Sequence, residues 1–236
     1  MNSLDKIYNH TFTLEIGDDL TPKDIDKENY TELEYYVNNT QFYFVHFLSL
    51  LSQLDNAVGL LSNFGYNQKN KISRGDHLTY NVENYMIRVI SVTDRLLQLI
   101  NMVYYLKVDE SKVNYKRVIG HAQIKDSTLE TLYTELRQIL SQYHNDRNSV
   151  VHRHSFINKE VYRLQALYHP ILTERFIARN PPEEVKKLKY VRSQALIKYT
   201  DKIKLQFRET NDACFEKILE MLDILYQEYN SNKGKL

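Results

Sequence analysis

Apolar side chains recur about every 3.5 residues along two long stretches of the sequence, and this period most constrains the fold. The stretches run from Val37 to Leu61 and from Leu78 to Leu106. Such spacing is typical of helices that pack lengthwise against other helices. The 236 residues include only 6 Gly and 4 Pro, so few residues are available to end short strands. The sequence therefore predicts two long helices that form an antiparallel hairpin.

Short signals indicate where the predicted helices begin and end. Gly65 follows the first stretch as a typical C-cap, and Asp76 precedes the second as an N-cap. After a basic connector, Ser127–Glu130 has the pattern of a capping box and starts a third helix. Pro170 is expected to kink or divide the following helix. The run from Asn180 to Glu184 then starts a C-terminal helical segment.

These elements predict an all-α fold, an up-and-down helical bundle with an additional C-terminal helical region. The bundle is expected to cover residues 30–178, and residues 179–236 to form a helical extension packed on the same domain. Residues 1–29 are rich in acidic side chains and are expected to form an irregular arm. The alternation of Phe12, Leu14 and Ile16 predicts a short extended piece within that arm.

Charge and cysteine content favour a cytoplasmic protein. The formal net charge of +1 excludes the bulk electrostatics of a general nucleic-acid coat protein. The single cysteine, Cys214, permits no internal disulfide and fits a reducing compartment. The acidic N-terminus lacks the pattern of a signal peptide, and the apolar run Phe42–Leu51 is too short to span a bilayer. We therefore expect a cytoplasmic protein with no membrane partner.

The densest run of titratable and amide side chains occupies residues 144–154, directly after the third predicted helix. One interpretation is an ordinary polar helix end. Another is a metal site in which His152 and His154 act with His144 or Asp146. Residues two apart on a helix point about 200° apart, so these histidines would share a metal only in an extended segment. No Cys or clustered Glu completes a ligand set, and we expect neither a metal nor another cofactor.

A third interpretation assigns Arg147 and His152 to the cleavage of a phosphodiester. Neutral imidazole titrates near pH 6.5 and serves as a general base or acid, and the planar guanidinium matches two phosphate oxygens. Together they could deprotonate a ribose 2′-hydroxyl and stabilise the charge on phosphorus, a reaction that only RNA offers. On a helix the two positions diverge by about 140°. A shared pocket then needs a helix break or a second copy of the chain.

The string Arg147-Asn148-Ser149-Val150-Val151-His152 resembles the Arg-x4–6-His motif of the HEPN superfamily, in which Asn often follows the Arg. The likeness covers roughly residues 30–178 and is closest to the Cthe_2314-like group. It implies a helical bundle, and many such proteins are metal-independent endoribonucleases in toxin–antitoxin, abortive-infection and other defence systems. The resemblance also implies a homodimer whose interface forms the active site.

The same resemblance suggests individual roles. His152 would act as general base and acid, and Arg147 as the ligand of the phosphate and the transition state. Asn148 would orient the substrate or the histidine. His154 stands where many active members have Tyr and would be auxiliary. Weaker candidates for contacts with RNA are Lys116, Arg117 and Arg153.

Other pairings and another class of function remain open. Arg147 with His154, and Arg163 with His169, also fit the spacing, although Pro170 makes the second pair a poor catalytic helix. The expected partners are an RNA substrate, a second copy of the chain and an antitoxin or regulator. The alternative is a catalytically inactive HEPN-like module for protein interaction or nucleotide binding.

Overall fold

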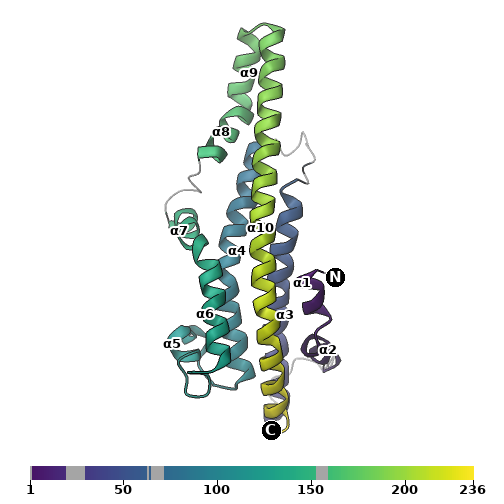
Figure 1. Cartoon of the computed structure of the whole chain (residues 1–236), viewed down its shortest axis with the longest axis vertical. Coiled ribbons are helices and arrows are strands. Elements are labelled where there is room, and N and C mark those ends of the chain that lie inside the picture. Colours follow the sequence, from purple (N-terminus) through teal and green to yellow (C-terminus); the bar gives the residue numbers. More distant parts are fainter. Residues whose placement is uncertain (1, 20–29, 63, 65–71, 153–158) are drawn as a thin grey trace. The chain divides into compact units, whose positions relative to one another are not determined.

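The computed structural model of the chain describes residues 2–19, 30–62, 64, 72–152 and 159–236 (Figure 1). Within these ranges all regular secondary structure is helical, which confirms the predicted all-α fold. No helix in the same ranges is long and apolar enough to cross a membrane. The helices are α1 (Ser3–Tyr8), α2 (Thr11–Asp18), α3 (Glu32–Leu60), α4 (Arg74–Val103), the 3-10 turn η2 (Glu110–Lys112), α5 (Tyr115–Val118), α6 (Thr128–Leu140), the 3-10 turn η3 (Ser141–Tyr143), α7 (His144–His152), α8 (Lys159–Tyr168), α9 (Pro170–Arg179) and α10 (Pro182–Lys233).

The chain divides into two compact units. Unit 1 consists of Met1–Gln53, Ile90–Gln142 and Asn211–Leu236, and unit 2 of Leu54–Val89 and Tyr143–Thr210. Helices α3, α4 and α10 each contribute residues to both units. The predicted division into an N-terminal arm, a bundle and a C-terminal extension remains a prediction.

The N-terminal segment differs from the irregular arm that the sequence suggested. Residues 3–18 form α1 and α2 within unit 1. Phe12 and Ile16 lie four residues apart, and both are buried on one face of α2. The ring of Phe12 lies 4.8 Å from that of Phe44 and 5.3 Å from that of Tyr229, between centroids. The predicted extended piece is therefore wrong: a helix buries Phe12 and Ile16 on one face, with Phe12 against Phe44 of α3 and Tyr229 of α10.

Side-chain bonds connect distant segments of unit 1. The buried Tyr36 hydroxyl on α3 donates to the Val103 carbonyl oxygen at the end of α4, at 2.8 Å. Lys217 on α10 forms an ion pair with Glu135 on α6, at 2.9 Å. These pairs connect segments far apart in sequence and agree with the predicted packing of long helices side by side.

The cap of α4 is shifted from its predicted position. Helix α4 begins at Arg74, and the side chain of Ser73 rather than that of Asp76 accepts a backbone N–H of its first turn. The Asp76 backbone N–H donates to Ser73 Oγ at 3.1 Å, and Ser73 Oγ donates to the Asp76 carboxylate at 2.7 Å. Asp76 therefore lies in the first turn, where its negative charge favours the positive end of the helix. The predicted C-cap at Gly65 lies outside the described residues.

Later helix boundaries agree with the sequence signals. Ser127 caps α6, and its Oγ accepts the Glu130 backbone N–H at 3.4 Å. Pro170 divides the predicted helix into α8 and α9 and is the first residue of α9. The C-terminal segment is one helix from Pro182 to Lys233. Local signals therefore predicted these ends because caps and proline act on the backbone within one turn.

Three aromatic side chains pack together within the core of unit 2. Tyr85 of α4 stacks on Phe207 of α10, with ring centroids 3.5 Å apart and planes inclined by 12°. Tyr143 of η3 meets Tyr85 edge-on at 5.7 Å, and its hydroxyl shares a hydrogen bond with Thr210 Oγ1 at 2.9 Å. These contacts join α4, η3 and α10 immediately before α7 begins.

Candidate functional site

Helix α7 carries residues 144–152 of the polar stretch singled out in the sequence, and Tyr143 anchors the beginning of the helix. Only 1% of Tyr143 is exposed. Its hydroxyl is satisfied by Thr210, and burial raises the pKa of the Tyr143 phenol. A buried, hydrogen-bonded tyrosine directly before His144 gives the short helix a fixed starting point in unit 2.

The side chains of α7 are accessible along the described part of the helix. None of the residues described there is buried, although Asp146 and Arg147 are half-buried. Burial raises the pKa of the Asp146 carboxyl. Arg147 Nη1 donates to Asn148 Oδ1 at 3.3 Å. The guanidinium has other N–H groups beyond that bond, so its chemistry suits binding of a further anionic oxygen.

The backbone of α7 determines the angle around the helix axis between positions 147 and 152 within one copy. The helix is continuous from His144 to His152, with no break between the two positions. They lie about 140° apart around the helix axis and face different sides. Position 148 lies one turn before position 152 on the same side of the helix. The side chain of His152 lies outside the described part of the structure.

The remaining predicted residues lie in other segments. Lys116 and Arg117 are exposed on α5, which belongs to unit 1, whereas α7 belongs to unit 2. Arg153 and His154 fall outside the described residues. The roles of all four in binding RNA or phosphate therefore remain predictions.

The structure also bears on the other two interpretations of the polar stretch, an ordinary helix end and a metal site. Residues 144–152 form a helix of their own after η3 and are not simply the polar end of α6. Within the described ranges, no three His, Cys, Asp or Glu side chains gather in a group that could hold a metal ion. The metal interpretation depends on His152 and His154, whose side chains are not among those described. The competing pair Arg163 and His169 is divided between α8 and the residue that precedes α9.

Tyr199 is a buried polar residue of unit 2 that no sequence pattern distinguishes among the 19 tyrosines. Only 3% of the residue is exposed, and its hydroxyl has no hydrogen-bond partner among the described residues. Burial raises the pKa of the Tyr199 phenol, and the negative charges of Glu160 and Asp146 raise it further. Asp146, whose charge acts on the Tyr199 phenol, immediately precedes Arg147.

We predict that Tyr199→Phe increases the free energy of unfolding by about 1 kcal/mol, because it removes a buried hydroxyl without a described partner. The matched control is Tyr143→Phe, which removes a hydroxyl bonded to Thr210 and should decrease the free energy by about 1 kcal/mol. Urea unfolding followed by circular dichroism measures both changes. Equal destabilisation by the two substitutions would contradict the prediction and indicate that the Tyr199 hydroxyl is satisfied.

The helices of the described residues place the protein in the class of all-α bundles, and comparison with known families identifies its family. Residues 61–230 match the model of the Cthe_2314-like HEPN family. Because the match covers most of the chain, the protein belongs to the HEPN family of that type. Searches of curated proteins and of solved structures found no match. The match includes α7 and most of α10, while the Arg147–His152 motif stays a prediction.

Proposed function

We propose that the protein is a metal-independent endoribonuclease that cleaves single-stranded RNA at a site formed by two copies of the chain. Family membership supports a ribonuclease or a nucleotide-binding module as the general class. The observation that carries the finer assignment is α7, a continuous helix on which none of the described residues is buried and on which positions 147 and 152 lie about 140° apart. A defence or toxin–antitoxin setting, with an antitoxin or regulator as partner, remains part of the proposal.

A two-fold dimer would resolve the divergence of the two positions on α7. In a symmetric dimer, the same surface of each copy faces its partner. If two α7 helices approach in opposite directions, Arg147 of one copy can face His152 of the other. Two equivalent sites would result, each with a guanidinium and an imidazole at one phosphate. Asn148, one turn from position 152, would orient the imidazole or the substrate.

The proposed chemistry needs only these side chains and the RNA itself. Neutral His152 would take the proton of a ribose 2′-hydroxyl, and the 2′-oxygen would form a bond to the adjacent phosphorus. The bond from phosphorus to the 5′-oxygen would break, and that oxygen would receive the proton from the imidazolium. The products are a 2′,3′-cyclic phosphate and a 5′-hydroxyl. Arg147 would stabilise the additional negative charge on the phosphoryl oxygens during the reaction.

An assay with a chelator tests the proposed reaction directly. Purified protein is incubated with labelled single-stranded RNA in EDTA, beside the same RNA with a 2′-deoxy substitution at the mapped cleavage position. We expect cleavage of the first substrate in EDTA and none at the substituted position, because the 2′-hydroxyl is the nucleophile. Cleavage that depends on added metal, or that persists without the 2′-hydroxyl, would overturn the mechanism. Absence of cleavage, together with binding of nucleotides, would instead favour the noncatalytic module.

A further inference from the structure

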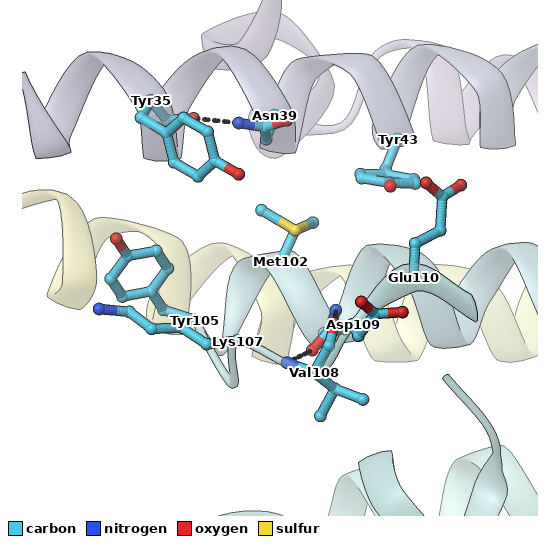
Figure 2. Close-up of a pocket in the computed structure, with 10 residues that line it drawn as sticks. Tyr35, Asn39, Tyr43, Met102, Tyr105, Lys107, Val108, Asp109 and Glu110 are labelled. Carbon is cyan, nitrogen blue, oxygen red and sulfur yellow. Dashed lines mark hydrogen bonds between the residues drawn. The ribbon is translucent and has the colours of Figure 1, made fainter. Parts of the chain in front are cut away.

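Unit 1 contains a pocket of about 540 Å³ that plays no part in the proposed ribonuclease site (Figure 2). One wall is the first part of α3, and the other is the end of α4 with the loop that follows it. Side chains that give the pocket its character are Tyr35, Tyr43, Met102, Tyr105, Asp109 and Glu110. Aromatic rings and two carboxylates therefore line the pocket, together with the ammonium of Lys107.

The α3 wall presents aromatic side chains at helical spacing. Tyr35, Asn39 and Tyr43 are four residues apart and lie on one face of α3. Asn39 Nδ2 donates to the Tyr35 carbonyl oxygen at 2.7 Å, which leaves its amide oxygen as an acceptor. Tyr35 is 51% exposed although it is large and aromatic. This face of α3 is therefore aromatic and open to a ligand.

The opposite wall is a loop whose backbone is held in an unusual conformation. Tyr105 and Lys107 have φ angles of 50° and 56°, in the left-handed region that residues other than glycine rarely adopt. Asn101 holds the loop: its Nδ2 donates to the Val108 carbonyl oxygen at 2.9 Å, and its Oδ1 accepts the Val108 N–H at 3.1 Å. Asn101 is buried, so these bonds are shielded from water. The loop therefore presents the Tyr105 ring in a fixed position, and such backbone conformations are common at ligand-binding sites.

The charges of the pocket favour a positive ligand. Lys107 is already paired: its Nζ lies 3.2 Å from Glu32 Oε1 and 4.3 Å from the centroid of the Tyr105 ring. The two remaining charged groups are the carboxylates of Asp109 and Glu110. Figure 2 shows the Glu110 carboxylate beside the Tyr43 ring. An anion would meet these carboxylates without a free lysine to balance them.

From this geometry we propose that the pocket binds an organic cation, a guanidinium or alkylammonium group, between the tyrosine rings and the carboxylate of Glu110. Aromatic faces attract cations through the negative potential of the ring, and the attraction is stronger where water is partly excluded. Glu110 would add a charge-assisted hydrogen bond to the same group. The Lys107 ammonium over the Tyr105 ring is a contact of the same kind within the chain.

Binding measurements with a cation and its uncharged analogue test the proposal on the full-length protein. N-acetyl-argininamide and N-acetyl-citrullinamide have nearly the same shape, but only the first is charged. Chemical-shift titration should show that the arginine derivative binds at least roughly tenfold more tightly. Binding of spermidine, a free polyamine, is measured in parallel. Tighter binding of spermidine indicates that the ligand is a small metabolite, and tighter binding of the arginine derivative indicates that it is a basic peptide. Equal binding of the charged and uncharged analogues, or no binding of either cation, overturns the proposal.

Two substitutions locate the binding. Glu110→Gln retains the side-chain size and removes the charge, and it should weaken binding of N-acetyl-argininamide by roughly tenfold. Tyr35→Ala removes an exposed ring, so it should weaken binding several-fold without unfolding the protein. The control is Glu216→Gln on the exposed side of α10 in unit 1, which should leave binding unchanged. Unchanged binding by both pocket variants would place the cation elsewhere and refute the assignment.

Discussion

Replacing His152 by Ala is expected to reduce RNA cleavage by roughly 10²–10⁴-fold, the usual contribution of a general acid–base residue. Arg147→Ala should reduce it by roughly 10²–10³-fold, because a fixed cation no longer stabilises the charge that develops on the phosphate. Initial rates on labelled RNA measure both effects. The control is His144→Ala, which removes an exposed histidine from the same helix and should leave the rate within about twofold.

Mixing the two inactive variants distinguishes a shared site from a site within one copy. A mixed dimer of Arg147→Ala and His152→Ala retains one site with both residues intact, the arginine from one copy and the histidine from the other. If subunits exchange at random, about one quarter of the wild-type sites are restored. No recovery after verified exchange would contradict the two-copy arrangement. Full activity of both single variants would reject Arg147 and His152 as the catalytic pair.

Phe207→Ala is expected to lower the free energy of unfolding by about 3–5 kcal/mol and the melting temperature by roughly 10 °C. Phe207 has no exposed surface, and it stacks on Tyr85 with centroids 3.5 Å apart. Its ring also lies 6.4 Å from that of Tyr143, which anchors the beginning of α7. The substitution therefore leaves a cavity beside the helix that carries Arg147. Thermal unfolding followed by circular dichroism measures the loss.

A neighbouring residue on α10 provides the matched control for Phe207. Leu205 lies two positions earlier in the same helix but is 58% exposed. Leu205→Ala should change the free energy of unfolding by less than about 0.5 kcal/mol, since it removes little buried apolar surface. If the two substitutions destabilise the protein equally, the packing of Phe207 does not contribute to the core of unit 2 as predicted.

Sequence signals predicted the helices correctly where each signal acts on its own neighbouring residues. Ser127 caps α6 and Pro170 starts α9, because both act through their own backbone neighbourhood. The alternation of Phe12, Leu14 and Ile16 suggested an extended piece, but Phe12 and Ile16 lie four residues apart and also define one face of a helix. Contact with Phe44 and Tyr229 favours the helix. The sequence could not reveal that contact, because Tyr229 is more than two hundred positions away.

The two candidate sites differ in the same respect, since one is visible in the sequence and the other is not. The run from Arg147 to His152 is visible in the sequence because its polar residues are adjacent, and the family match supports the HEPN assignment on which their proposed roles rest. The cation pocket left no comparable signal. Its walls combine Tyr35 with Tyr105, which are seventy positions apart, and the second ring is placed by a left-handed backbone.

By itself, the sequence determined that the chain is helical, because the apolar period, the scarcity of glycine and proline, and the caps each act over one or two turns. It also indicated the polar run that became α7. Only the tertiary structure decided that Tyr143 anchors this helix against α10, and that no break separates positions 147 and 152. The physical reason is that burial and pairing join residues distant along the chain, and side-chain periodicity specifies the buried face of a helix but not its partner.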